Sequence, residues 1–172
     1  MAAKQVAWMA GLTGAVVVAS AAAAQPPPVS PTAFAETVAS SHEFEILEGE
    51  TAIAQSRDPR VRAFAQQMIQ DHGRASQALI QAVATSSLQS PVMAVNADQA
   101  RLLSGLQGLK GIEFDRLYAT HQILAHQEAL TVKQSYAIRG LDLNLKQAAG
   151  AAIPLIQHHL DMAQQLRAAV GG

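Results

Sequence analysis

The 172-residue sequence contains no cysteine, which excludes a disulfide framework and leaves no thiol for a lipid anchor. Aromatic residues account for only 4% of the chain. Strand-forming β-branched residues are scattered, whereas Ala, Gln, Leu, Glu and Arg predominate, and these are good helix formers. The composition therefore predicts an all-α protein that is held together by its hydrophobic core alone.

An excess of basic charge is also missing, because 12 Lys and Arg residues face 13 Asp and Glu residues. Proteins that bind nucleic acid carry a basic face, so no nucleic-acid partner is expected. Motifs for covalent catalysis are absent as well, with no cysteine, no G-x-S-x-G and no phosphate-binding loop. The sequence therefore assigns the protein to no enzyme class, and it carries no signal for an oligomeric state.

The first 24 residues differ from the rest: Lys4 is followed by an apolar run from Val6 to Ala19 and then by "SAAAAQ". This is the layout of a secretory signal peptide, with cleavage expected near Ala24. The alternative is an uncleaved anchor, but a run of about 15 residues is shorter than the ~20 that span a bilayer. We expect a protein exported to the periplasm or the extracellular space, with no transmembrane anchor in its mature form.

Residues 25–31, "QPPPVSP", form a Pro-rich spacer, and the domain itself is expected over residues 32–170. Four long helices and one short helix are predicted, over about 32–56, 58–85, 96–107, 112–138 and 142–168. Asp58 and Pro59 are typical of a helix start, and Gly140 of a helix end. Two tight turns and one long connection predict a ferritin-like four-helix bundle with one long crossover that contains the short helix.

One polar residue on each long helix is predicted to face the core. An α-helix turns about 100° per residue, so the side on which a residue lies follows from its apolar neighbours. This arithmetic places four polar residues inward: Glu45, His72, His126 and His159. Glu48 flanks Glu45, whereas His121 and His158 are expected to face solvent.

Three imidazoles and one carboxylate form a set that suits a single divalent metal ion such as Zn, Fe, Mn or Cu. A buried carboxylate is costly unless it is paired or bound to a metal. Glu45 precedes the first turn by ~13 residues and His72 follows it by ~14, so antiparallel helices would bring both to one level. Such a protein would store or buffer metal, or protect against stress.

Two alternatives remain open at this point. The four residues could form a buried hydrogen-bond network in a structural or interaction protein of the cell envelope, without metal. They could also hold a mononuclear redox centre, which would need an open coordination position. Asp71, Asp115 and Tyr118 are expected to pack or to form hydrogen bonds rather than to bind metal.

A di-iron centre is disfavoured, because ferritin-like sites use Glu-x-x-His pairs. The residues three positions before the inward histidines are all isoleucine: Ile69, Ile123 and Ile156. Met68 and Met162 lie one helical turn from two of the histidines, which leaves a softer copper site open, although methionine at helical spacing is typical of core packing.

Three stretches are similar to the signature blocks of an exported bacterial family, domain of unknown function 4142 (DUF4142). These stretches are "FEILEGETAIAQSRDPRVRAFAQQMIQDH", "GIEFDRLYATHQILAHQEAL" and "AAIPLIQHHLDMAQQL". The matching positions are Glu45, Met68, Asp71, His72, Phe114, Asp115, Tyr118, His126, Gln127, Pro154, His159 and Leu160, while Ile153 replaces the usual leucine. The resemblance implies an exported ferritin-like bundle without an established activity, and fold alone does not carry function.

Overall fold

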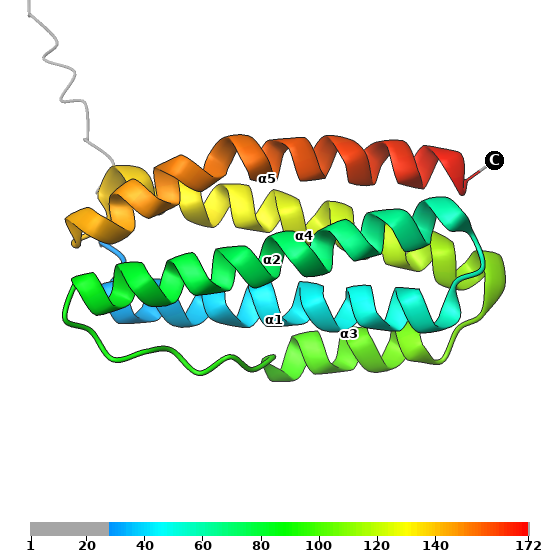
Figure 1. Cartoon of the computed structure of the whole chain (residues 1–172), viewed down its shortest axis with the longest axis horizontal. Helices are drawn as coiled ribbons and strands as arrows, with labels where there is room; N and C mark the ends of the chain where they lie inside the picture. Colours follow the sequence, from blue (N-terminus) through cyan, green and yellow to red (C-terminus); the bar gives the residue numbers. More distant parts are fainter. Residues whose placement is uncertain (1–27, 172) are drawn as a thin grey trace, which may run out of the picture.

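The structure is a computed structural model that describes residues 28–171, so the predicted signal peptide lies outside the described residues. Within that range the chain forms five helices: α1 (Pro31–Gln55), α2 (Pro59–Thr85), α3 (Ala97–Gln107), α4 (Gly111–Arg139) and α5 (Leu143–Ala169). Figure 1 shows four long helices side by side, with the short α3 outside the bundle next to α1. The predicted all-α bundle with a long crossover and a short extra helix is confirmed.

The helix starts follow the local sequence signals. The Asp58 side chain accepts a hydrogen bond from the Arg60 amide, and the Asp142 side chain accepts one from the Leu145 amide. Both satisfy amides that have no partner within the helix. Pro31, predicted as part of the spacer, is instead the first residue of α1, a position where its missing N–H costs nothing.

The four long helices form a ring in which α1 packs against α2, α2 against α5, α5 against α4, and α4 against α1. The crossover between α2 and α4 carries α3, which contacts both α1 and α4 from outside. α5 continues through Pro154, and its first part is inclined to the rest (Figure 1). Because Pro154 has no N–H, it cannot donate the usual hydrogen bond within the helix.

Two apolar clusters fill opposite halves of the bundle. One lies toward the α1–α2 turn and includes Phe64, Met68 and Tyr118. The other lies toward the α4–α5 turn and includes Phe34 and Tyr136, whose rings stack at 3.8 Å. The inward polar residues of the four long helices fall between these clusters along the chain, so the bundle has a polar layer in its middle.

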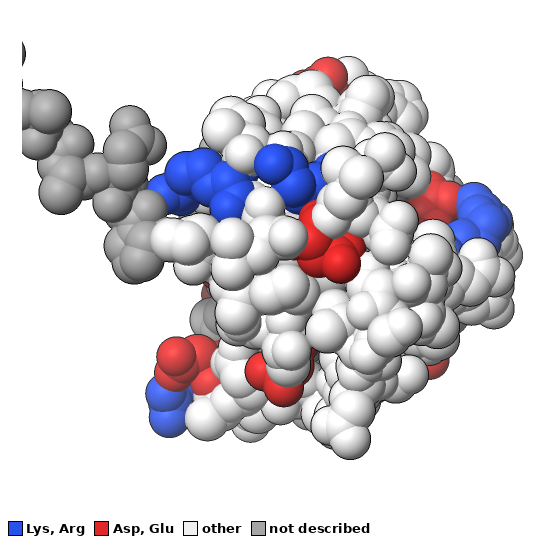
Figure 2. All heavy atoms as spheres, turned by 90° about the vertical axis from the view of Figure 1, so that its left-hand side faces the viewer, with Lys and Arg blue, Asp and Glu red and all other residues white. Residues whose placement is uncertain are grey.

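The end of the bundle that holds the α4–α5 turn is largely uncharged, with small separate groups of basic and acidic side chains (Figure 2). At this turn Ile138, Leu141 and Leu143 are 64–75% exposed. No helix in the described part of the chain is long and apolar enough to cross a membrane.

Candidate metal centre

Three histidines from three helices meet in the middle of the bundle. His72 of α2, His126 of α4 and His159 of α5 each offer a ring nitrogen, and these nitrogens all lie within 4.8 Å of one another. All three residues are buried. The structure therefore brings together the three histidines that the helical arithmetic placed inward.

Glu45 of α1 joins this cluster from one side. Its carboxylate oxygen Oε2 lies 3.7 Å from His72 Nε2 and 3.7 Å from His126 Nδ1. It forms no ion pair with His159, so it adjoins two of the three histidines. Its side chain is fully buried, and a buried carboxylate needs a compensating partner.

Hydrogen bonds outside the cluster fix the orientation of two imidazoles. His126 Nδ1 lies 2.7 Å from the Gln122 carbonyl oxygen, and His159 Nε2 lies 2.9 Å from Asp71 Oδ2. An oxygen acceptor at that distance requires each of these nitrogens to carry the proton. The opposite nitrogens, His126 Nε2 and His159 Nδ1, are then left with free lone pairs, as is usual for metal-binding histidines.

Six polar atoms of these four side chains have no hydrogen-bond partner among the described residues. They are both oxygens of Glu45, both ring nitrogens of His72, Nε2 of His126 and Nδ1 of His159. Each buried unsatisfied polar group costs about 1–3 kcal/mol, and folded proteins keep few of them. In the observed geometry these atoms do not satisfy one another through direct hydrogen bonds.

Burial shifts the protonation of the cluster toward its neutral forms. It lowers the pKa of His72 well below the ordinary value and that of His126 to about 4. It also lowers the pKa of His159, against the opposing effect of Asp71. Burial, with a further contribution from Glu48, raises the pKa of Glu45 well above its usual range. Near neutral pH the imidazoles are therefore uncharged, which is the form that binds metal.

His121 was expected to face solvent, and this prediction is wrong. It is buried, and its Nδ1 lies 2.6 Å from Glu48 Oε1, while the Gln122 amide donates to Glu48 Oε2 at 3.1 Å. Its partner Glu48 lies on α1, so His121 faces the helix that packs against α4 rather than solvent. His158, in contrast, is exposed as expected.

His42 is a residue that the sequence reasoning missed. It is buried, its Nδ1 lies 3.3 Å from Ser76 Oγ, and its ring centroid is 5.4 Å from that of His72. Its position three residues before Glu45 places it on the same side of α1, a signal that could have revealed it. Asp71, which was expected to pack or to form hydrogen bonds, forms a hydrogen bond with His159, one of the inward histidines.

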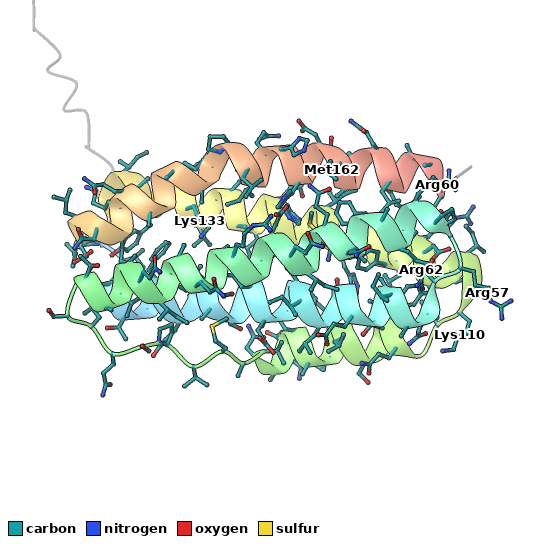
Figure 3. All side chains as sticks on the ribbon, viewed as in Figure 1. Arg57, Arg60, Arg62, Lys110, Lys133 and Met162 are labelled. Carbon is teal, nitrogen blue, oxygen red and sulfur yellow. The ribbon has the colours of Figure 1, made fainter. Side chains whose placement is uncertain are left out.

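A pocket of about 400 Å³ has the three histidines in its wall. Exposed leucines also line it, so the cluster communicates with the surface. Neither Met68 nor Met162 lines this pocket: Met68 is part of the apolar core, and Met162 borders a different groove together with Phe64 (Figure 3).

The isoleucines that replace the di-iron carboxylates serve packing. Ile69 lies over Gly49 at the contact of α1 and α2, where its Cγ1 is 2.8 Å from the place that a Cβ on Gly49 would occupy. Ile123 and Ile156 belong to an apolar cluster of α4 and α5. These three positions therefore supply no bridging carboxylate.

The fold and the cluster define a helical-bundle protein with a buried three-histidine candidate metal centre. The chain belongs to the DUF4142 family, a domain of unknown function, whose model matches residues 17–166. No curated protein matches the sequence.

Two solved structures share the fold. CopM in its Cu(II)-bound form has a TM-score of 0.69 at 15% identity, over 83% of this chain and 98% of that chain. A DUF305 protein of Streptomyces coelicolor, described as secreted, has a TM-score of 0.68 at 16% identity, over 81% of this chain and 91% of that chain. Identities this low show the fold alone.

Proposed function

We propose that this protein binds a single divalent first-row transition metal through His72, His126 and His159, with Glu45 as the fourth ligand. The observation that carries the proposal is the convergence of buried donor atoms that have no other partner among residues 28–171. A metal ion would bind one ring nitrogen of each histidine together with the Glu45 carboxylate, which would offset part of its charge.

The spacing of the histidines supports such a site after a small contraction. An equilateral triangle with sides of 4.8 Å has its centre about 2.8 Å from each corner, against the 2.0–2.1 Å of a zinc–nitrogen bond. Each ring would move inward by roughly 0.7 Å, a shift within reach of side-chain rotation. The hydrogen bonds from His126 to the Gln122 carbonyl and from His159 to Asp71 would keep the donor nitrogens aimed at the ion.

The donor set restricts the choice of metal. Imidazole nitrogens and a carboxylate suit Zn, Cu, Fe and Mn, and for such a site affinity rises along the series to Cu²⁺. The structural neighbour CopM is described in a Cu(II)-bound form. Copper and zinc are therefore the first ions to test, and storage, buffering or stress protection is the role that fits binding alone.

We infer that this binding takes place after export. The support is the N-terminal layout of Lys4, the apolar run from Val6 to Ala19 and the small residues near Ala24. One structural neighbour is also described as a secreted protein. Fractionation of cells that produce the full chain tests this, because a periplasmic product that begins near residue 25 is expected, and a cytoplasmic product that retains residues 1–24 contradicts it.

Elemental analysis of the mature protein, purified without a histidine tag, tests the metal site. We expect one metal per chain, lost in His72→Ala and retained in His158→Ala, since His158 is exposed and lies next to a proposed ligand. A metal-free protein whose thermal stability does not change on addition of Zn, Cu, Mn or Fe would favour the alternative of an envelope interaction protein.

A further inference from the structure

A buried lysine without a counter-ion lies in the same pocket as the histidines. Lys133 of α4 is 8% exposed and lines the pocket of about 400 Å³. Its amino group makes no hydrogen bond or ion pair within residues 28–171, and its one specific contact is with the Phe34 ring, whose centroid is 5.8 Å away. A buried cation is costly without an anionic partner.

Lys133 is separated from the metal centre along the bundle. It follows His126 by seven residues on α4, which corresponds to about 10 Å of helix rise on nearly the same face. Figure 3 shows Lys133 in the half of the bundle that holds the start of α1. Its charge also acts on the neighbouring imidazoles, since it contributes to the lowered pKa values of His42 and His72. A second metal ion beside this cation is therefore disfavoured, whereas an anion is favoured.

The rest of the pocket wall is mainly apolar. Val38, Ala129 and Val132 line it near Lys133, and its solvent-exposed rim includes three leucines: Leu102, Leu124 and Leu155, which are 45–58% exposed. A volume of about 400 Å³ falls within the 300–1,000 Å³ typical of small-molecule sites. The walls suit an apolar body, and the amino group of Lys133 suits one negative charge.

We propose that the pocket binds a small organic anion with an apolar body, such as a medium-chain carboxylate, and that its acidic group pairs with Lys133. This site is additional to the metal centre and uses none of the four proposed metal ligands. The carboxylates that line the pocket do not take this role: Asp71 is paired with Arg74 and His159, and Glu128 is exposed without an ion pair to Lys133.

Calorimetric titration of the mature protein with octanoate tests the proposal, with octanamide as an uncharged probe of the same length. We expect one octanoate per chain, and octanamide binding weaker by roughly tenfold or more, because a charge-assisted hydrogen bond is lost. In Lys133→Met, octanoate should bind only as weakly as octanamide does. Lys146→Met is the matched control, because Lys146 does not line the pocket and donates to the Ile138 carbonyl, and it should leave octanoate binding unchanged.

A second variant and a chelator experiment complete the test. Ala129→Leu, which fills the pocket near Lys133, should weaken the binding of both probes even if Lys133→Met does not fold. Treatment with a chelator should leave octanoate binding intact, which separates this proposal from that of the metal. Equal binding of octanoate and octanamide, undiminished octanoate binding in Lys133→Met or Ala129→Leu, or loss of octanoate binding with the metal would overturn the proposal.

Discussion

Asp71 Oδ2 lies 2.9 Å from His159 Nε2, which leaves the other ring nitrogen of that histidine, Nδ1, without a hydrogen-bond partner among the described residues. The Asp71–His159 pair joins α2 to α5 at the level of the cluster. Both residues are buried, so the orientation of the imidazole is determined before any metal arrives.

Asp71→Asn should weaken metal binding by about 10- to 100-fold while keeping one site per chain, because the charged acceptor that orients a ligand is replaced by a neutral amide but the ligand remains. Competition with a chromophoric chelator measures the effect. Arg74→Gln is the matched control, since Arg74 pairs with the same carboxylate from a largely exposed position. If Arg74→Gln weakened binding as much as Asp71→Asn does, the orienting role of the His159 contact would be disproved.

Glu45→Gln should raise the melting temperature of the metal-free protein at pH 7 and lower its metal affinity. The pKa of Glu45 is raised in the folded state, whereas in the unfolded chain it is about 4.5. Above pH 4.5 the unfolded chain is therefore stabilised by releasing a proton that the folded protein retains, and this cost to folding disappears below that pH. The stabilisation by Glu45→Gln should therefore vanish as pH falls toward 4. Calorimetric scans at both pH values measure it.

Glu48→Gln provides the contrast to Glu45→Gln. The Glu48 carboxylate is also fully buried, but His121 and the Gln122 amide are its hydrogen-bond partners. Loss of this carboxylate should destabilise the metal-free protein, because His121 and the Gln122 amide lose the charged group with which they form hydrogen bonds. Stabilisation by both substitutions, or by neither, would contradict the different roles assigned to the two glutamates.

The metal-free protein should lose stability as pH falls below about 6.5. Burial lowers the pKa of His42 to about 3 and that of His126 to about 4. Between these values and 6.5 the unfolded state binds protons that the folded state does not, so unfolding becomes easier as pH falls. Each such histidine contributes up to about 1.4 kcal/mol per pH unit in this range.

Denaturant titrations over pH 4–7 measure this dependence. The variant His42→Gln should flatten the curve, because one of the histidines with a lowered pKa is removed, whereas His158→Gln should leave the slope as it is, since His158 is exposed. The same titration in Glu45→Gln removes the opposing contribution of Glu45. If the stability of that variant were constant across pH 4–7, the imidazoles would not be buried as the structure has them.

Gly49→Ala should destabilise the protein by about 1–3 kcal/mol, because overpacking outweighs the better helix propensity of alanine. The added Cβ would lie 2.8 Å from Ile69 Cγ1 and 3.2 Å from the Ala65 carbonyl oxygen. Gly105→Ala in α3 is the control, because a Cβ there has nothing within 4 Å, and a gain of up to about 1 kcal/mol is expected. Equal effects in urea unfolding would contradict the close approach of α1 and α2.

The sequence was sufficient to predict the bundle because the helix signals are local. Asp58 and Pro59 start one helix and Gly140 ends another, and each acts through its own backbone neighbours. The inward direction of Glu45 and His72 was likewise readable from their apolar neighbours. Whether the four side chains meet depends on how far each helix is shifted along its neighbour. Tertiary packing determines this shift, and the residue pattern within one helix does not.

The misjudged histidines show where the helical arithmetic fails. His121 lies outside the stripe of α4 that carries His126, yet it is buried against Glu48 of α1. A short helix with a single buried residue, Leu106, gives little sequence evidence of where it docks. Lys133 and the pocket likewise depend on the packing of α1 against α4, which periodicity within one helix does not describe.

Crystallography of the mature protein with Zn²⁺ or Cu²⁺, with data collected on either side of the metal absorption edge, tests the central claim most directly. We expect a single strong anomalous peak about 2.0–2.2 Å from His126 Nε2, His159 Nδ1, a ring nitrogen of His72 and a Glu45 oxygen. A peak elsewhere on the molecule, or no peak between these four side chains at saturating metal, would contradict the account.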